Sequence, residues 1–408
     1  MFDVTKKSAR ENLGGSEIVP PRGFLDSEYE ERLDKVQESI RNKQLDAIVL
    51  TSEHDILYFS GFYSQFWQSP TRPWFMVLPA EGKPIAVIPS IGFDGMDKTW
   101  LDDIRVWESP NPKDEGVSLL ARTILELPRK FSRIGFSLGA ENYVRMPLND
   151  YARLGELLNG FEIADVTNEL QRLQSVKSSC EIAKLRYISK VTSEGFAYLP
   201  SYLSAGETER ETCKKFMIDL LNRGADSVPF MIAGSGYWGY QNIIMGPTDR
   251  IMNAEDVLVI DTGAVYGGYY CDFDRNYAFG HADQWTLDAY DLVYEATNFG
   301  LEAAVPGATC SDVFWAMQNV LDLGGALREG QSQNCVGRYG HGIGVRLTEW
   351  PSISAKDHTL LEVGMVLAIE PSISYGEGRL MVQEENVVIT EQGAELLSHR
   401  ASEKMIVI

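Results

Sequence analysis

The sequence lacks any apolar run long enough to cross a membrane. Its longest apolar stretches, such as residues 47–50 and 74–79, are far shorter than the roughly 20 residues that a transmembrane helix needs. Residues 1–24 are polar and carry no apolar segment of the length found in secretory signals. We therefore expect a soluble, cytoplasmic protein without a membrane partner.

Cysteines and basic side chains are also scarce. Five cysteines are scattered along the chain without a C-x-x-C pair, which fits reduced thiols better than a disulfide framework or a zinc knuckle. The 37 basic residues against 58 acidic ones give a formal net charge of −21. Because nucleic acids require a basic footprint, this balance argues against a nucleic-acid partner.

The chain has 408 residues, more than one hydrophobic core normally serves, so two domains are expected. In its first part helical and strand-like patterns alternate, which is typical of an α/β layer. The periodicity predicts helices over 28–43, 116–127 and 151–158 and strands over 46–51, 74–79, 84–89 and 133–138. We predict an α/β domain over residues 1–172, in which residues 1–24 form an extended segment.

The remaining residues, 173–408, indicate an α+β domain. A long helix is predicted to begin near Ser178, with Glu181 placed to cap its first turn, and to end near Tyr198. Further helices are predicted over 208–221, 286–303 and 310–323, with strand-like segments before Phe279 and over 364–389.

Polar residues end or interrupt several apolar strands of this second domain, where a charge needs a physical reason. Asp261 ends the apolar run 257–260, and Asp272 follows eleven residues later. A hairpin with its turn near Gly267 and Gly268 would bring both carboxylates together on adjacent strands. Because two like charges facing each other repel, the hairpin predicts a cation between them.

Three more residues extend this set. His341 lies among glycines, which suits a strand that passes close to a ligand or ion. Glu370 ends the run 365–369, and Glu384 emerges from another strand fourteen residues later. Four carboxylates and one imidazole suit manganese, cobalt(II), iron(II) or zinc, and are too rich in carboxylate for a structural zinc site.

The order and flanks of these five positions resemble a known family. The chain contains D-x-G-x-x-x-x-G-Y from Asp261, D-x-D-R from Asp272, G-H-G-I-G around His341, G-M-V-x-x-x-E-P through Glu370, and E-E-N-V from Glu384. This pattern resembles the pita-bread hydrolases, which include Xaa-Pro aminopeptidase, prolidase, methionine aminopeptidase and creatinase. The resemblance covers residues 177–408 closely and reaches residues 29–61, which are similar to the creatinase and prolidase N-terminal domain.

The resemblance implies an α/β N-terminal domain followed by an α+β pita-bread catalytic domain. It also implies two divalent ions per chain, with manganese favoured over cobalt, iron or zinc. Asp261 would hold one ion, Asp272 and Glu384 would bridge the pair, and His341 and Glu370 would complete the other. The implied reaction is hydrolysis of an amide C–N bond in short Xaa-Pro peptides, in which Glu370 also carries a proton toward the leaving nitrogen.

Four positions depart from the resembled pattern. Ile244 and Thr348 stand where the family has histidines, and Val382 stands where it commonly has an arginine. In the family these groups orient the scissile carbonyl and bind the carboxyl end of the substrate, so their replacement leaves the substrate open. Asp274 stands where a threonine is usual. It would either tune the adjacent metal or pair with Arg275, and we favour the ion pair because such pairs are common.

Arginines and aromatic side chains near the motifs are candidates for substrate binding. Six aromatics surround Arg72 in residues 61–75. A similar Arg-Pro stretch of creatinase reaches across a dimer, so Arg72 is a candidate carboxylate clamp in trans within a homodimer. These aromatics would equally serve as core and interface. The pocket residues expected with Arg72 are Trp67, Trp238, Tyr240, Arg338, Thr348 and Trp350.

Other reactions remain open at this point. The altered outer positions favour a small-molecule C–N hydrolase similar to creatinase or ectoine hydrolase, acting on a small zwitterionic substrate. Some relatives perform lyase chemistry on dimethylsulfoniopropionate, which is a further alternative. A binding module without catalysis is disfavoured by the complete ligand set.

Overall fold

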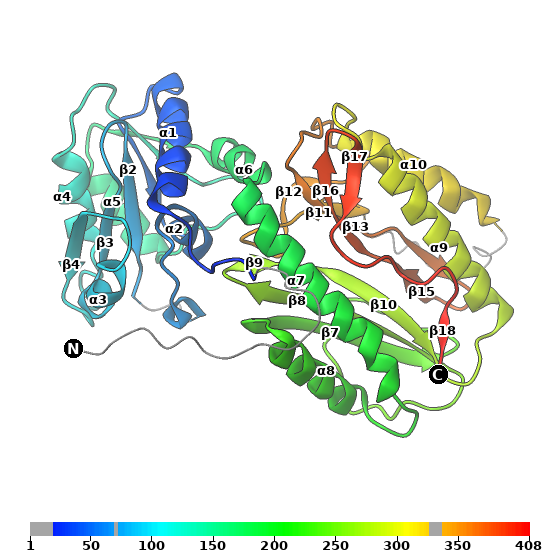
Figure 1. Cartoon of the computed structure of the whole chain (residues 1–408). Coiled ribbons are helices and arrows are strands. Elements are labelled where there is room, and N and C mark those ends of the chain that lie inside the picture. The colour runs from blue at the N-terminus through cyan, green and yellow to red at the C-terminus, as the bar shows by residue number, and fades with distance from the viewer. Residues whose placement is uncertain (1–18, 69–71, 326–336) are drawn as a thin grey trace.

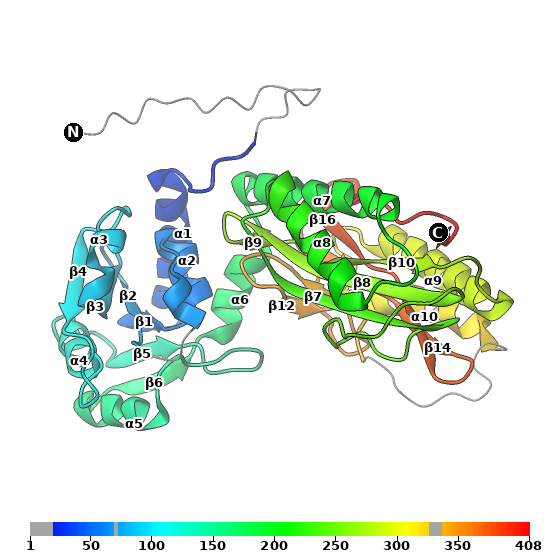
Figure 2. The same cartoon turned by 90° about the horizontal axis from the view of Figure 1, so that it is seen from below.

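A computed structural model describes residues 19–68, 72–325 and 337–408. The chain forms an N-terminal α/β part and a larger C-terminal α+β part, which lie side by side in Figures 1 and 2. No helix of the described residues has both the length and the apolar character needed to span a bilayer. Most of the extended segment predicted over residues 1–24 lies outside the described residues.

The N-terminal part is built on a mixed six-stranded sheet in the order β4-β3-β2-β1-β5-β6. Its strands are β1 (Ala47–Leu50), β2 (Phe75–Pro79), β3 (Ile85–Pro89), β4 (Asp103–Trp107), β5 (Arg133–Phe136) and β6 (Glu162–Asp165). Its helices are α1 (Asp26–Asn42), α2 (Glu53–Ser60), α3 (Phe93–Met96), α4 (Val117–Leu125), α5 (Leu148–Leu157) and α6 (Thr167–Ser175), with short 3-10 turns at Gln65–Gln68 and Ser90–Gly92.

Both faces of this sheet are buried. The side chains of Ile48 and Leu50 in β1 lie in one core with α1, whereas Val49 lies in a second core with α4 and α5. A strand covered on both faces is continuously apolar, which explains why the buried strands β1, β2 and β3 show no polar alternation. The edge strands β4 and β6 carry charged residues and are less buried. The sequence did not predict α2, α6, β4 or β6, and α6 spans the predicted boundary between residues 172 and 173.

The C-terminal part contains two main sheets and a hairpin. Their strand orders are β18-β10-β8-β7 with β9 paired to β8, β12-β11-β13-β16-β17, and β14-β15. The strands of the first sheet are β7 (Ser227–Tyr237), β8 (Asp256–Tyr266), β9 (Tyr269–Tyr270), β10 (Phe273–Ala278) and β18 (Ile406–Val407). The others are β11 (Gly340–Gly342), β12 (Glu349–Ser352), β13 (Val366–Ile369), β14 (Ser372–Tyr375), β15 (Arg379–Val382), β16 (Glu385–Thr390) and β17 (Gly393–Leu396).

Four long helices cover these sheets. They are α7 (Ser179–Tyr198), α8 (Glu209–Arg223), α9 (Gln284–Ala303) and α10 (Cys310–Leu323), with a 3-10 turn at Leu199–Ser201. The helix expected from Ser178 begins with the predicted capping box, because the Ser178 hydroxyl accepts from the Glu181 amide and the Glu181 carboxylate accepts from the Ser178 amide. Leu258 and Ile260 of β8 pack with α7 and α8, whereas Val257 and Val259 lie in the core shared with α9 and α10.

The two parts are connected by polar contacts as well as by the chain. The Arg32 guanidinium on α1 lies 3.6 Å from the Glu181 carboxylate on α7, and the Tyr269 hydroxyl donates to the same carboxylate at 2.8 Å. Arg346 forms an ion pair of 3.1 Å with Asp55 at the start of α2. These contacts hold the N-terminal part against the C-terminal part.

Candidate metal centre

The hairpin of β8 and β10 presents three carboxylates on one face. Asp261 lies directly opposite Asp274 in the antiparallel register, and Asp272 precedes Asp274 by two residues, so all three side chains share a face. The predicted hairpin is present, but the residue facing Asp261 is Asp274 and not Asp272. Asp272 is the diagonal neighbour of Asp261. Asp261 continues the alternation of Val257 and Val259, and therefore points toward the second sheet.

The second sheet supplies the remaining groups. His341 in β11 pairs with Ala368 in β13, and Glu370 directly follows that strand. Gly340 has φ +146°, and a Cβ atom there would lie 2.2 Å from the Ala368 carbonyl oxygen. Only glycine allows this close approach of the two strands, so the glycine context of His341 has a physical cause. Glu384 lies between β15 and β16.

These groups converge on one point. Ligand atoms of Asp272, His341 and Glu384 all lie within 4.8 Å of one another, and all three residues are buried. The His341 Nε2 atom lies 3.5 Å from Asp272 Oδ2 and 3.6 Å from Glu370 Oε1. The Asp261 carboxylate lies within hydrogen-bonding range of the Asp272 carboxylate. The structure thus brings together all five predicted residues.

The electrostatics of this cluster call for a positive partner. Burial raises the pKa of Asp272, Asp261 and Glu384 well above the usual carboxyl values, and the neighbouring carboxylates raise them further. The buried atoms Asp261 Oδ1, Asp272 Oδ1 and Glu384 Oε1 have no hydrogen-bond partner in the structure. Unpartnered buried oxygens are rare in folded proteins, so these residues fit divalent cations.

The orientation of His341 fits the same purpose. Its Nδ1 atom lies 2.8 Å from the Gly342 carbonyl oxygen, to which the neutral ring can donate. Burial lowers the pKa of His341, which favours that neutral form. With the proton on Nδ1, the lone pair of Nε2 faces Asp272 and Glu370, as a metal-binding histidine requires.

Comparison with known proteins identifies the family. Residues 183–391 match metallopeptidase family M24, and residues 32–176 match the creatinase/prolidase N-terminal domain. The chain belongs to metallopeptidase family M24. The resemblance and fold class predicted from the sequence are thereby confirmed, and the chain is a metal-dependent hydrolase of the pita-bread type.

Several relatives align with this M24 enzyme over nearly its full length. A probable dipeptidase PepE of Mycobacterium bovis is 28% identical over 390 residues, which cover 95% of this chain and 98% of the relative. The crystal structure of dipeptidase PepE from Mycobacterium ulcerans superposes with a TM-score of 0.81 at 27% identity, covering 95% of this chain and 99% of that one. A prolidase from Thermococcus sibiricus shares the fold, with a TM-score of 0.82 at 22% identity and coverage of 93% and 99%.

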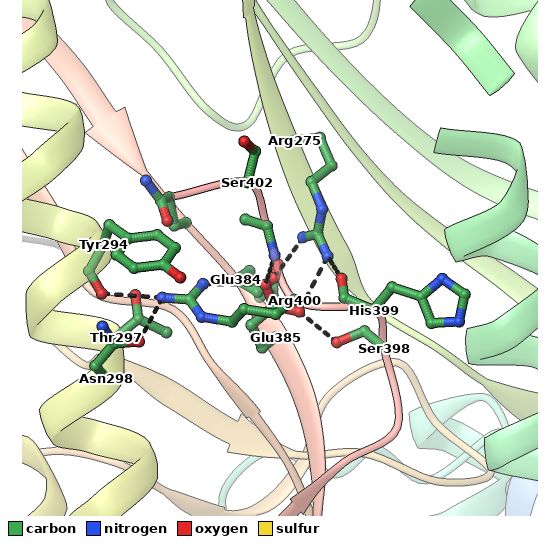
Figure 3. Close-up of polar contacts among 12 residues, drawn as sticks. Arg275, Tyr294, Thr297, Asn298, Glu384, Glu385, Ser398, His399, Arg400 and Ser402 are labelled. Atoms are coloured by element: carbon green, nitrogen blue, oxygen red, sulfur yellow. Dashed lines mark hydrogen bonds and ion pairs between the residues drawn. The ribbon is translucent and has the colours of Figure 1, made fainter. Parts of the chain in front are cut away.

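Asp274 does not form the expected ion pair. Arg275 lies 3.0 Å from the Glu385 carboxylate instead, and Arg400 approaches the same carboxylate at 3.1 Å (Figure 3). The prediction was wrong because alternate residues of a strand point to opposite faces, so Asp274 and Arg275 diverge. Asp274 is buried beside Asp261, and its Oδ1 atom accepts from the Glu384 amide at 3.1 Å.

Among the predicted pocket residues, Arg338 is the one whose charge reaches the cluster. Burial raises the pKa of Asp272 and Glu370, and the positive charge of Arg338 partly offsets that rise in both. Arg338 also lies 3.6 Å from Glu141 of the N-terminal domain. Thr348 and Trp350 line a small neighbouring hollow together with Glu141 and Arg346.

The other expected pocket residues are divided between several places. Trp67 packs against Phe62 and Trp74 in the N-terminal aromatic core, and the Arg72 guanidinium lies 5.5 Å from the ring centre of Phe66. Tyr240 is fully buried, and its hydroxyl donates to Asn276 Oδ1 at 2.8 Å and accepts from the Val382 amide at 3.1 Å. Burial raises the pKa of Tyr240, and the nearby charges of Asp274 and Asp261 raise it further, so this side chain lies near the carboxylates. Trp238 and Tyr240 both line a cavity of about 870 Å³, together with Trp285 and Arg379.

Sequence reasoning missed one residue that positions the centre. The Asn386 side chain accepts from the Asp272 amide at 2.9 Å and donates to the Asp272 carbonyl oxygen. It therefore fastens the β8–β10 hairpin to β16. The available signal was an asparagine in an otherwise apolar strand, where an amide must find partners.

Proposed function

We propose that this M24 enzyme is a dinuclear-metal peptidase that hydrolyses the amide bond of short Xaa-Pro peptides. The observation that supports the metal centre most directly is the convergence of Asp272, His341 and Glu384 within 4.8 Å in a buried site. In this proposal Asp261 would hold one ion, His341 and Glu370 would hold the second, and Asp272 and Glu384 would contribute to both. Bound divalent ions supply Lewis acidity for the scissile carbonyl and lower the pKa of water.

Side chains of the protein carry the proton and position the ligands in this proposal. Glu370 is the best placed proton carrier, because its side chain is 19% exposed whereas those of Asp272 and His341 are 7% and 5% exposed. Burial raises the pKa of Glu370, which suits a carboxylate that takes a proton from water and passes it to the leaving nitrogen. The Asn386 side chain holds the backbone of Asp272 in place while this proton moves.

Substrate recognition rests on Arg338 in this proposal. Ile244 and Val382 have apolar side chains, so neither position offers a polar group to a substrate. The charge of Arg338 acts on the carboxylate cluster, and its Nη1 atom contacts Glu141 and Ser352. A guanidinium carries five N–H donors, more than these two contacts use. A guanidinium binds a carboxylate with two parallel hydrogen bonds, so Arg338 is suited to the free C-terminus of a dipeptide.

Metal content and substrate range test the proposal together. The purified chain is expected to bind two divalent ions, measured by elemental analysis, and to lose activity after EDTA treatment. Xaa-Pro dipeptides, longer Xaa-Pro peptides, creatine and ectoine should be compared with manganese present. Release of amine from the Xaa-Pro members alone is expected, and turnover of creatine or ectoine alone contradicts the peptidase assignment.

The proposal also covers the native metal, the oligomeric state, the cellular location and the domain boundary. We infer that manganese is the native metal, because a carboxylate-rich set suits this ion. We infer a homodimer in which Arg72 reaches the neighbouring site, a cytoplasmic location consistent with scattered cysteines, and a domain boundary between residues 172 and 173. Light scattering tests the dimer, since a monomer at micromolar concentration rules out the trans role of Arg72.

A further inference from the structure

Asp274 is a buried carboxylate that forms no side-chain ion pair within the described residues. It is 1% exposed and lies opposite Asp261 in the register of β8 and β10. Its Oδ1 atom accepts from the Glu384 amide, whereas its buried Oδ2 atom has no hydrogen-bond partner. A buried acid with a free oxygen is costly unless a cation or proton satisfies it.

Both carboxylates and arginines surround Asp274. Asp261, Asp272, Glu370 and Glu384 carry four negative charges, which two divalent ions balance, and Asp274 adds a fifth. Arg275 and Arg400 both approach the fully buried Glu385, from the two sides seen in Figure 3. In the described part of the chain Glu385 is the only carboxylate within ion-pair distance of either arginine, so this group keeps one positive charge in excess.

The excess positive charge lies next to Asp274. Arg275 is its sequence neighbour on β10, and Glu384, whose amide donates to Asp274, directly precedes Glu385. The Arg275–Glu385–Arg400 group and Asp274 thus form a pair of opposite net charges separated by one strand. This positive charge can balance a fifth carboxylate. A threonine at the same position would be neutral and would need no such balance.

We propose that Asp274 is a further carboxylate of the metal centre, on the side of the ion that Asp261 holds. Its Oδ2 atom adds an oxygen donor and one negative charge to the set Asp261, Asp272, His341, Glu370 and Glu384. The Arg275–Glu385–Arg400 group balances that charge from the opposite face. The inference rests on the proposed metal site and deepens it by assigning a sixth side chain to it.

Metal titration separates this role from a structural one. Asp274→Asn keeps the shape and the oxygen that accepts from the Glu384 amide, but removes the charge. Metal-free wild type, Asp274→Asn and the exposed control Glu391→Gln should be titrated calorimetrically with manganese(II) alone, and their melting temperatures measured without metal. Glu391 lies in the turn between β16 and β17 and should leave both quantities unchanged.

We expect Asp274→Asn to weaken manganese binding without lowering the stability of the metal-free protein. The Kd for manganese rises about 10- to 100-fold in Asp274→Asn. The melting temperature without metal stays equal or rises, because a neutral amide replaces a buried carboxyl group that lies opposite Asp261. A Kd within twofold of wild type overturns the inference and leaves the proposed centre intact. A lower melting temperature without metal overturns it in favour of a structural role. Absence of manganese binding in wild type overturns the proposed function itself.

Discussion

Lys177 Nζ lies 2.8 Å from Glu349 Oε2, and the two side chains are only 2% and 6% exposed. This buried ion pair joins Lys177, two residues before α7, to the start of β12, between Thr348 and Trp350 of the candidate pocket. Glu349 also accepts from the Arg346 amide through its other oxygen, at 3.0 Å. The pair therefore stabilises β12, the strand that follows β11 with its His341.

We predict that Lys177→Met destabilises the protein by about 3–5 kcal/mol, because it leaves the Glu349 carboxylate buried without its cation. Urea unfolding monitored by fluorescence measures the change in the free energy of unfolding. The exposed pair Arg172–Glu362, at 3.4 Å, provides the matched control, and Arg172→Met should cost less than about 1 kcal/mol. The double variant Lys177→Met/Glu349→Leu should recover most of the loss. If Lys177→Met and Arg172→Met changed the free energy of unfolding equally, the buried pair would contribute no more stability than an exposed one.

A second prediction concerns the stability of the metal-free protein as a function of pH. Burial raises the folded-state pKa of Asp261, Asp272, Asp274 and Glu384, so their stabilising contribution is complete below the unfolded carboxyl pKa near ~4 and is lost as pH rises. Burial lowers the pKa of His341, which opposes this trend with a single group. The melting temperature of EDTA-treated protein should therefore fall between pH 5 and pH 8.

Manganese should reverse that fall. Cations replace the protons that the carboxylates would otherwise need, and so they stabilise the folded state more at pH 8 than at pH 5. Thermal scans with and without manganese at each pH provide the measurement. A profile that is independent of pH and of manganese would contradict the electrostatic description of the centre.

The third prediction isolates the imidazole ligand. His341→Ala should weaken manganese binding about 100-fold or more and lower the bound stoichiometry, because it removes the one nitrogen donor of the set. Elemental analysis after dialysis measures the metal content. His281→Ala is the control, since His281 is 60% exposed and contacts Glu255 at the surface. Retention of two ions by His341→Ala would remove this residue from the centre.

The fourth prediction concerns Arg338. Arg338→Met should raise KM for Xaa-Pro dipeptides about 10- to 100-fold with a smaller change in kcat, because a charge-assisted hydrogen bond contributes about 1.5–3 kcal/mol. C-terminally amidated Xaa-Pro substrates lack the carboxylate and serve as the control, for which KM should change little. An equal loss on both substrates would assign Arg338 a structural role.

Local patterns were sufficient for much of this protein. The capping box of Ser178 and Glu181, the apolar strands that end in Asp261 and Glu370, and the glycines around His341 each depend on near neighbours in the chain. Such features can be predicted because helix capping and strand burial are short-range effects. Helix α6 and strand β6 were missed because their residues are only partly apolar and gain their burial from distant elements.

One error at the site comes from reasoning by adjacency. The pairing of Asp274 with Arg275 was predicted because the two residues are neighbours in the chain, whereas strand alternation sends their side chains to opposite faces. Which partner each side chain then meets depends on the elements that cover those faces, and Glu385, the partner of Arg275, lies 110 residues away in the sequence.

The amino-acid order by itself determined the family, the two-domain plan and the identity of the five charged groups, because each is encoded in a short run of residues. Only the tertiary structure decided that Asp274 joins Asp261 on the hairpin, that Arg275 and Arg400 share Glu385, and that Arg338 alone of the candidate pocket residues acts on the cluster electrostatically. The register of one hairpin sets the first of these relationships. Sheet packing sets the contact of Arg275 with Glu385, because it brings together strands that are about a hundred residues apart in the sequence.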